Sequence, residues 1–296
     1  MNPGRPKGGP GGIVAPAGYV GLLQDGATWL VRSDCASSLA ASGAAQLLER
    51  GSGPVVEPGS GRAVPVALHV GAVGAIGKRA RHGGGARILG GYYLGRRRAV
   101  HPLTCAVRLR ASGVSTPSVL AVGWRRVLGP LTVHALITEL IPGAVNLQAA
   151  LASRMATLER RAVLAAAGAE VRKMHDAGFL HADLNLANLV LEPRQTGPRA
   201  HIVDLDRGRF EPALTPEQRR SNLERLLRSW EKWRPGGRAL GPRDALAFLR
   251  GYCGGDRDSR RGLFHELRRL RGRFGARRLL WRWSGRPGGI VFPADQ

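Results

Sequence analysis

The stretch from His181 to Asp206 reads HADLNLANLVLEPRQTGPRAHIVDLD, and it constrains the chain more than any other segment. Two apolar runs, Leu189–Leu191 and His201–Leu205, predict a pair of short strands joined by a turn that contains Gly and Pro. Such a hairpin holds Asn188 at the start of one strand and Asp204 at the end of the other. Their side-chain oxygens then converge on one point, which is what a Mg²⁺ ion carrying nucleotide phosphates requires of a protein.

Asp183 precedes this pair and is positioned to accept a proton from an attacking hydroxyl. The joint pattern H-x-D-L-N-x-x-N followed by I-V-D is the layout of the catalytic loop and metal-binding Asp of kinases. An isolated H-x-D or D-x-D motif often marks an ordinary turn, so the joint pattern carries the inference. It predicts an α+β, two-lobed protein-kinase-like fold with a small β-rich N-lobe and a mainly helical C-lobe. In this layout His181 braces the loop and takes no part in the chemistry.

The segments HADLNLANLVL and HIVDLDRGRF resemble the lipopolysaccharide kinase family, which includes Kdo and heptose kinases. The resemblance implies that Asp183 is the catalytic base and that Asn188 and Asp204 bind Mg²⁺. It also implies ATP as the phosphoryl donor and a lipopolysaccharide-core sugar or a related glycolipid as the acceptor. Asp206 stands where protein kinases have the Gly of D-F-G, and an acidic residue there is typical of this family. The resemblance spans roughly Glu57 to Tyr252 and is weaker in the N-lobe.

A glycine-containing segment and a lysine suggest where the phosphates bind. The segment Glu57–Arg62 (EPGSGR) is expected to join two strands, and its Gly59, Ser60 and Gly61 would cover the phosphates with main-chain N–H groups. Lys78 follows on the next predicted strand, where kinases keep the lysine that holds the α- and β-phosphates. The alternative interpretation is that Lys78 is only a solvated strand end. The basic segment that follows, KRARHGG, resembles the family and favours the phosphate-binding role.

The lobes are expected to meet near Pro142. Leu136–Ile141 predicts a buried strand that leads into a hinge, where main-chain groups of Glu139 and Ile141 would hydrogen-bond adenine. The predicted domains are therefore a basic tail at residues 1–12, an ATP-binding N-lobe at 13–142 and a C-lobe at 143–296.

One kinase feature is missing from the sequence. The segment His101–Leu109 predicts the helix that follows the lysine strand, with Pro102 in its first turn. Kinases place a Glu on this helix to pair with the lysine, but no acidic residue occurs between Glu57 and Glu139. Two alternatives to a sugar kinase therefore stay open: another kinase-like phosphotransferase, for a small molecule or a protein, and a non-catalytic pseudokinase that binds an anionic glycolipid or membrane.

The net charge of +24 indicates an anionic partner. Nucleic acid is not expected as the partner, because only the positive charge favours it and no aromatic stacking pattern accompanies the arginines. An anionic membrane surface is the expected partner, because Asp258–Trp283 predicts a basic amphipathic helix or helix pair with an apolar stripe. The alternative is that this stripe packs on the C-lobe. No apolar run is long enough to span a bilayer. The expected location is cytoplasmic, peripheral on the cytosolic face of the inner membrane.

Overall fold

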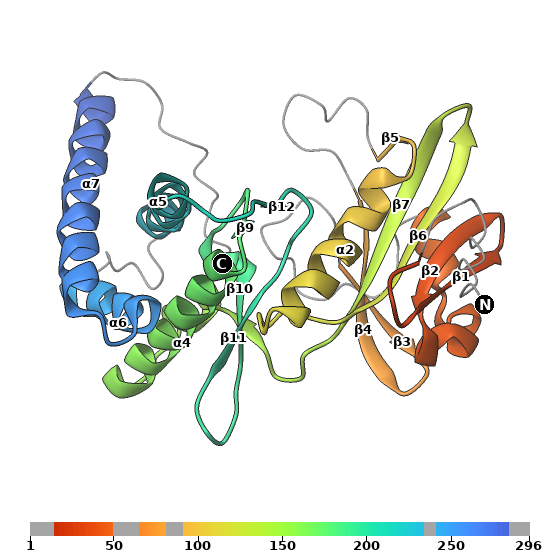
Figure 1. Ribbon diagram of the computed structural model, residues 1–296, viewed down its shortest axis with the longest axis horizontal. Helices are drawn as coiled ribbons and strands as arrows, with labels where there is room; N and C mark the ends of the chain where they lie inside the picture. Colours follow the sequence, from red (N-terminus) through yellow and green to blue (C-terminus); the bar gives the residue numbers. More distant parts are fainter. Residues whose placement is uncertain (1–14, 50–64, 81–90, 234–240, 284–296) are drawn as a thin grey trace, which may run out of the picture.

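The computed structural model describes residues 15–49, 65–80, 91–233 and 241–283, with the side chains of the last helix described as far as Leu270. An antiparallel sheet makes up one part of the molecule, and a mainly helical part lies beside it (Figure 1). Together they form the expected α+β, two-lobed architecture.

The sheet has seven strands in the order β1-β2-β6-β7-β4-β3, and β5 pairs with β7 beyond the end of β4. All neighbouring strands are antiparallel. Their bounds are β1 Tyr19–Gln24, β2 Ala27–Arg32, β3 Val66–Val70, β4 Val73–Arg79, β5 Tyr93–Leu94, β6 Val119–Leu128 and β7 Leu131–Glu139. The β1–β2 hairpin matches the alternating pattern of the sequence, and Lys78 lies on β4 as predicted.

Helices cover both faces of this sheet. Helix α2 (Arg97–Ala111) packs on one face, and helix α1 (Ala44–Glu49) packs on the other. Taken from the sequence alone, Ser38–Glu49 predicts one short helix, and this prediction is wrong. The chain forms two short 3₁₀ turns, η1 (Ser33–Ser38) and η2 (Ala40–Ser42), before α1. Gly43 has a φ of 71°, and this left-handed conformation ends η2 and separates it from α1.

Pro102 lies inside α2 and not in its first turn, because the helix begins at Arg97. The sequence placed the helix start too late. The charged side chains of α2 are all arginines: Arg97, Arg98, Arg108 and Arg110. The missing acidic partner for Lys78 is therefore not supplied by this helix.

The mainly helical part begins after the connection that follows Glu139. Its long helix α4 (Thr157–Asp176) ends two residues before Gly178, which has a φ of 75°. A glycine at this place predicts the helix end from the sequence. The other elements are β8 Val145–Asn146, α3 Leu147–Ala152, β9 Phe179–Leu180, η4 Leu186–Asn188, β10 Leu189–Glu192, β11 Arg199–Ile202, β12 Arg209–Phe210, α5 Pro216–Trp233, α6 Pro242–Cys253 and α7 Arg257–Trp283.

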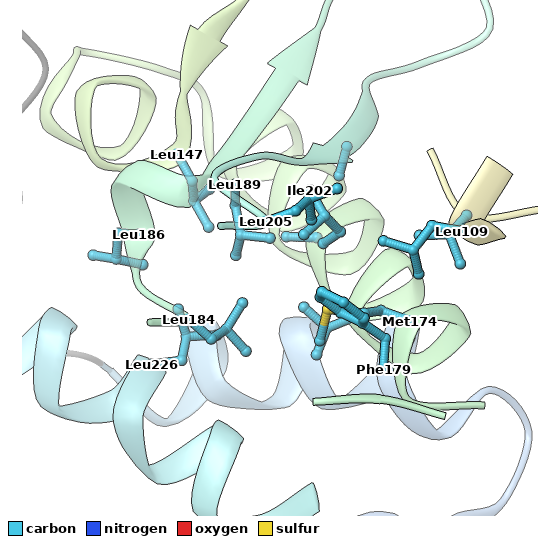
Figure 2. Close-up of a cluster of buried hydrophobic side chains, with 14 of the residues drawn as sticks. Leu109, Leu147, Met174, Phe179, Leu184, Leu186, Leu189, Ile202, Leu205 and Leu226 are labelled. Carbon is cyan, nitrogen blue, oxygen red and sulfur yellow. The ribbon is translucent and has the colours of Figure 1, made fainter. Parts of the chain in front are cut away.

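Leucines of the loop between β9 and β10 anchor that loop in the main hydrophobic core. Leu184, Leu186 and Leu189 have no exposed surface, and they point into a cluster with Met174 of α4 and Phe179 of β9 (Figure 2). The core therefore fixes every second or third residue of the segment and leaves the polar residues between them for the site.

The C-terminal segment forms one long helix, α7, at the end of the molecule away from the sheet (Figure 1). Its apolar residues Leu263, Phe264, Leu267 and Leu270 are half-buried against the core. Arg220 of α5 also forms an ion pair with Glu266 of α7, with 3.0 Å between Nη1 and Oε1. The stripe therefore packs on the protein over its described length. None of the described helices is both long and apolar enough to cross a membrane.

Candidate active site

His181 connects the two halves of the site. Its imidazole is buried, accepts a hydrogen bond at Nδ1 from the Asp183 amide at 3.1 Å, and donates from Nε2 to the Val203 carbonyl at 3.0 Å. These bonds require the neutral tautomer with the proton on Nε2. Burial lowers the pKa of His181, which favours that neutral form. The ring thus ties the loop that carries Asp183 to the segment that carries Asp204, as expected of a bracing residue.

Helix α5 holds the main chain of His181. The side chain of Asn222 accepts a hydrogen bond from the His181 amide at 3.2 Å and donates one to the His181 carbonyl at 2.9 Å. The Asn222 Oδ1 atom also lies 3.3 Å from His175 Nε2, and His175 Nδ1 lies 2.8 Å from the Tyr252 hydroxyl. All these groups are buried. The start of the loop is therefore fixed by a polar network that reaches α6.

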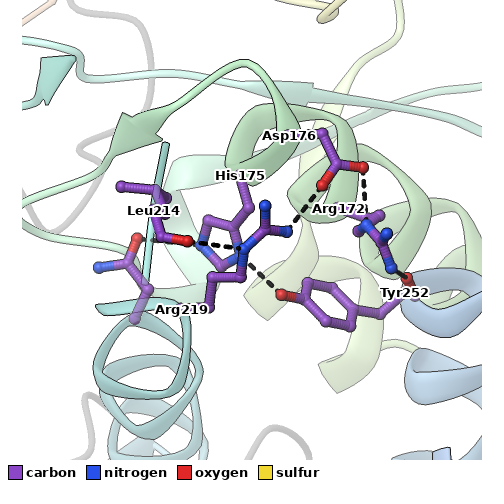
Figure 3. Close-up of polar contacts among 7 residues, drawn as sticks. Arg172, His175, Asp176, Leu214, Arg219 and Tyr252 are labelled. Carbon is purple, nitrogen blue, oxygen red and sulfur yellow. Dashed lines mark hydrogen bonds and ion pairs between the residues drawn. The ribbon is translucent and has the colours of Figure 1, made fainter. Parts of the chain in front are cut away.

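Ion pairs surround this network on its exposed side (Figure 3). Asp176 forms two ion pairs: Oδ2 lies 2.6 Å from Arg172 Nε, and Oδ1 lies 2.7 Å from Arg219 Nη1. Arg219 Nε also donates a hydrogen bond to the Leu214 carbonyl at 3.5 Å. The two arginines hold the pKa of Asp176 below its ordinary value, although burial acts against them. These contacts join α4, α5 and the segment before α5, and so they support the helices that position the loop.

Two asparagines fix the main chain of Asp183. Its carbonyl accepts from Asn188 Nδ2 at 2.8 Å and from Asn185 Nδ2 at 3.1 Å. Asn185 Oδ1 in turn accepts from the amides of Ala187 and Asn188, which starts the turn η4. The main chain of Asp183 is thus held on both sides while its carboxylate is exposed. This is the arrangement that a general base for an external substrate needs.

The β10–β11 hairpin brings the main chains of Asn188 and Asp204 close together. The β10–β11 ladder pairs Leu189 with Ile202, and the Val203 amide donates to the Asn188 carbonyl at 3.0 Å. The side-chain Nδ2 of Asn188 donates its hydrogen bond to the Asp183 carbonyl. The side-chain Oδ1 of Asn188 has no partner within the described part of the chain. Asp204 is exposed and has a φ of 62°, a left-handed conformation that costs a non-glycine residue about 1 kcal/mol or more.

These two oxygen donors fit a metal that is shared with a ligand. Among the described residues, no group of three or more His, Cys, Asp or Glu side chains is arranged to hold a metal by itself. A divalent ion at Asn188 and Asp204 would therefore take its remaining ligands from phosphate oxygens and water. Mg²⁺ in nucleotide sites is bound in this way.

Asp206 lies among positive charges at the junction of the two parts. It is half-buried, and the charged groups around it include Lys78 of β4, Arg98 and His101 of α2, and the neighbouring Asp204. Burial raises the pKa of Asp206, Asp204 raises it further, and the three basic groups oppose the rise. The sequence left open what orients Lys78, and an acid from another element lies in its neighbourhood.

Contacts between α2 and the segment after Asp206 hold this junction together. His101 Nε2 donates to the Gly208 carbonyl at 2.8 Å, and the Arg108 guanidinium lies 3.9 Å from the centre of the Phe210 ring. The ring of Phe179 packs directly on Gly208, where any Cβ would lie 2.0 Å from Phe179 Cζ. Only glycine allows this close approach, so Gly208 is required for the path of the chain beyond Asp206.

The predicted nucleotide-binding residues divide into two groups. The segment with Gly59, Ser60 and Gly61 lies outside the described residues, and the described elements on either side of it are α1 and β3. The expectation that this segment joins two strands therefore stays a prediction. Lys78 is half-buried on β4.

The expected hinge follows β7. The Glu139 amide donates to the Ser118 carbonyl at 2.8 Å, which fixes the start of the connection. The Ile141 amide has no acceptor within the described residues, so this donor is available to a ligand. Glu139 and Ile141 also line a cavity of about 340 Å³ with residues 113–118 and His201.

Sequence reasoning missed Asn185 and Asn222. Asn185 was visible in the L-N-x-x-N pattern, but nothing showed that its side chain starts the turn η4. Asn222 lies 41 residues after His181, and only the packing of α5 against the loop brings them together.

Comparisons with known proteins agree with this geometry. Residues 80–252, more than half of the chain, match the sequence model of the lipopolysaccharide kinase (Kdo/WaaP) family. The chain is 34% identical over 122 residues to the 3-deoxy-D-manno-octulosonic acid kinase of Vibrio parahaemolyticus serotype O3:K6, covering 41% of this chain and 47% of that protein. It is 32% identical over 124 residues to the enzyme of the same name from Vibrio cholerae serotype O1, covering 42% and 49%. The chain thus spans about half the length of the curated relatives it matches.

A solved structure supports the fold. WaaP in complex with acyl carrier protein superposes with a TM-score of 0.51 and covers 76% of this chain and 91% of that one, at 23% sequence identity. At this identity the likeness is one of fold alone.

Proposed function

Because the chain belongs to the lipopolysaccharide kinase (Kdo/WaaP) family, we propose that it is a sugar kinase. It transfers the γ-phosphoryl group of ATP to a hydroxyl of a lipopolysaccharide-core sugar, Kdo or heptose, or of a related glycolipid. The observation that carries the proposal is the joint arrangement of Asp183, Asn188 and Asp204. Their main chains are fixed by the bonds of His181 and Asn188, while the carboxylates of Asp183 and Asp204 stay exposed.

Asp183 takes the proton of the acceptor hydroxyl as the sugar oxygen forms its bond to phosphorus and ADP leaves. Asn188 and Asp204 would hold Mg²⁺, which would neutralise charge on the phosphates. Lys78 holds the α- and β-phosphates, and the Ile141 amide and Glu139 carbonyl hold adenine. Catalysis of this kind depends mostly on positioning and on fixed charges.

Asp206 takes the place of the missing helix glutamate as a positioning residue. Lys78 needs a negative partner to hold its ammonium group in one direction, and α2 carries no acidic side chain. Asp206 follows the metal-binding Asp204 by two residues and lies in the electrostatic neighbourhood of Lys78. One short segment would then orient both the metal and the lysine.

A pseudokinase that binds an anionic glycolipid or membrane is the second candidate, and the acid-free α2 favours it. The complete set of Asp183, Asn188 and Asp204 opposes it, because a protein that only binds a ligand has no need of an exposed, fixed base. A phosphotransferase for a small molecule or a protein is the third.

The enzyme acts at the cytosolic face of the inner membrane, where a lipid-linked acceptor is found. The exposed arginines of α7 contribute to this attachment. Over the described length these are Arg257, Arg261, Arg268 and Arg269. The attachment is loose, because the apolar stripe of the helix is used in packing.

The test is transfer of radiolabelled γ-phosphate from ATP to a panel of acceptors: Kdo-containing lipid A precursor, heptose-containing core, free sugars and a protein mixture. The proposal expects label on the Kdo- or heptose-containing glycolipid. Label on protein or on a different small molecule would assign another kinase activity. Tight binding of ATP or glycolipid without transfer to any acceptor would establish the pseudokinase.

A further inference from the structure

Three leucines lie side by side at the tip of the β6–β7 hairpin. Leu131 of β7 is paired with Leu94 of β5 on one side and with Leu128 of β6 on the other. Directly opposed residues of antiparallel strands point to the same face, so the three side chains form one row across three strands. Leu94 is 79% exposed and Leu128 is 74% exposed, and the adjacent Val127 is also exposed. This row is called the leucine row below.

The leucine row is held by a rigid frame. The Thr132 hydroxyl lies 3.1 Å from the Tyr93 carbonyl and 2.8 Å from the Gly95 carbonyl, and the Gly95 amide donates to the Pro130 carbonyl at 3.0 Å. The Tyr93 ring stacks on His134 with 4.6 Å between ring centres. These contacts lie on the opposite face and fasten β5 to the hairpin. The exposure of the leucines is therefore a fixed property of the fold.

Positive charge lies close behind the leucine row, on both faces of the sheet. Arg97 at the start of α2 and Arg126 on β6 are exposed. Arg126 pairs with Thr132, so it points to the face opposite the row, and α2 packs on that opposite face too. Arg125 points to the same face as the row, because it pairs with Val133 two residues beyond Leu131. Its guanidinium is partly used by Glu49 at 3.3 Å. The sequence carries no acid between Glu57 and Glu139, so α2, β5 and β6 supply no acidic side chain to offset Arg97 and Arg126.

We infer that the leucine row docks on an anionic membrane surface. The tip inserts end-on: Leu94 and Leu128 enter between the lipids, and Arg97 and Arg126, behind them on the other face, contact the phosphates of the headgroups. An exposed apolar row at a rigid tip, with arginines behind it, matches the chemistry of the bilayer interface. A second copy of the chain fits less well, because it would bring two acid-free, arginine-rich surfaces together.

This docking site is separate from α7, which lies at the other end of the molecule (Figure 1). The inference rests on the proposed function in one respect: docking on a membrane would bring the enzyme to a lipid-linked acceptor. Binding to lipid is measured without ATP or acceptor, so each can fail without the other.

The first experiment measures co-sedimentation of the full chain with phosphatidylcholine vesicles, with and without phosphatidylglycerol. The wild type is expected to bind the anionic vesicles and to lose binding as salt rises. The double variant Leu94→Ser/Leu128→Ser is expected to bind them roughly tenfold or more weakly, since two exposed leucines are lost from the lipid contact. The control is Leu23→Ser: Leu23 is 71% exposed on the β1–β2 hairpin, beside Asp25. It should leave binding unchanged.

The second experiment reports on the tip itself. Leu128→Cys is labelled with an environment-sensitive fluorophore, and Leu23→Cys serves as the control; the three native cysteines are buried. Anionic vesicles should shift the emission of the label at residue 128 to the blue and leave the label at residue 23 unchanged.

Five results would overturn the inference. The first three are no vesicle binding by the wild type, equal binding by the double variant, and an unshifted label at residue 128 on bound protein. The other two are a dimer in gel filtration that the double variant dissolves, and recovery of an acidic protein partner in place of lipid binding. Unchanged phosphate transfer to a water-soluble acceptor by the double variant would show that its fold and site are intact. If no variant transfers phosphate but the tip still binds lipid, the proposed function fails and the docking surface stands.

Discussion

Replacing Asn222 by Ala should weaken both the fold and the site, although Asn222 contacts no expected substrate. The substitution removes the acceptor of the His181 amide and the donor to the His181 carbonyl, at 3.2 and 2.9 Å. Both main-chain groups are buried, and each unsatisfied buried group costs about 1–3 kcal/mol. The free energy of unfolding should therefore fall by about 2–6 kcal/mol for the two groups together, and the lower value applies if water enters the space.

Guanidinium chloride unfolding, followed by circular dichroism, measures this change. The control is Ser221→Ala, because Ser221 is exposed on the same helix and should alter the free energy of unfolding by less than about 0.5 kcal/mol. Turnover should also fall in the folded Asn222 variant, since Asp183 lies two residues beyond the loosened main chain. A loss of stability below about 1 kcal/mol, with full turnover, would refute the view that α5 holds the catalytic loop.

Three further predictions concern the metal, the lysine and pH. Asp204→Asn should weaken Mg·ATP binding or abolish turnover; equal affinity by calorimetry with full activity would contradict the metal assignment. Asp206→Asn should lower turnover roughly tenfold or more, since Lys78 loses its negative neighbour, whereas unchanged turnover would remove Asp206 from the site. Burial lowers the pKa of His175 from 6.5 to about 4. Protonation therefore favours the unfolded chain, and stability present above pH 6.5 should be lost as the pH falls toward 4, by about 3 kcal/mol in all. His175→Gln should have a flatter pH profile in chemical unfolding, and an equally steep profile would refute this.

The catalytic loop was predictable because its residues are close in the sequence. Asp183, Asn188 and Asp204 lie on one hairpin, so strand periodicity and turn residues were sufficient to place them. Gly178 was recognisable as a helix end for the same local reason, and its φ of 75° confirms it.

The rest of the site depends on contacts between distant segments. Asp206 was recognised only as an acid in an unusual position, because its approach to Lys78 requires the packing of α2 against the chain beyond Asp206. Pro102 suggested a helix start, but the tertiary contacts of α2 extend the helix toward the N-terminus past it. The leucine row needs the pairing of β5 with β7, which no periodicity in a two-residue strand reveals.

The most direct test of the proposed mechanism is the separation of binding from turnover in Asp183→Asn. The variant keeps the main-chain bonds of Asp183 and loses only the carboxylate that accepts the proton. Circular dichroism should match the wild type, Mg·ATP affinity should remain within a few-fold of it, and transfer of phosphate to the Kdo- or heptose-containing acceptor should fall by roughly 10²-fold or more. Transfer at the wild-type rate by this variant would contradict the assignment of Asp183 as the base.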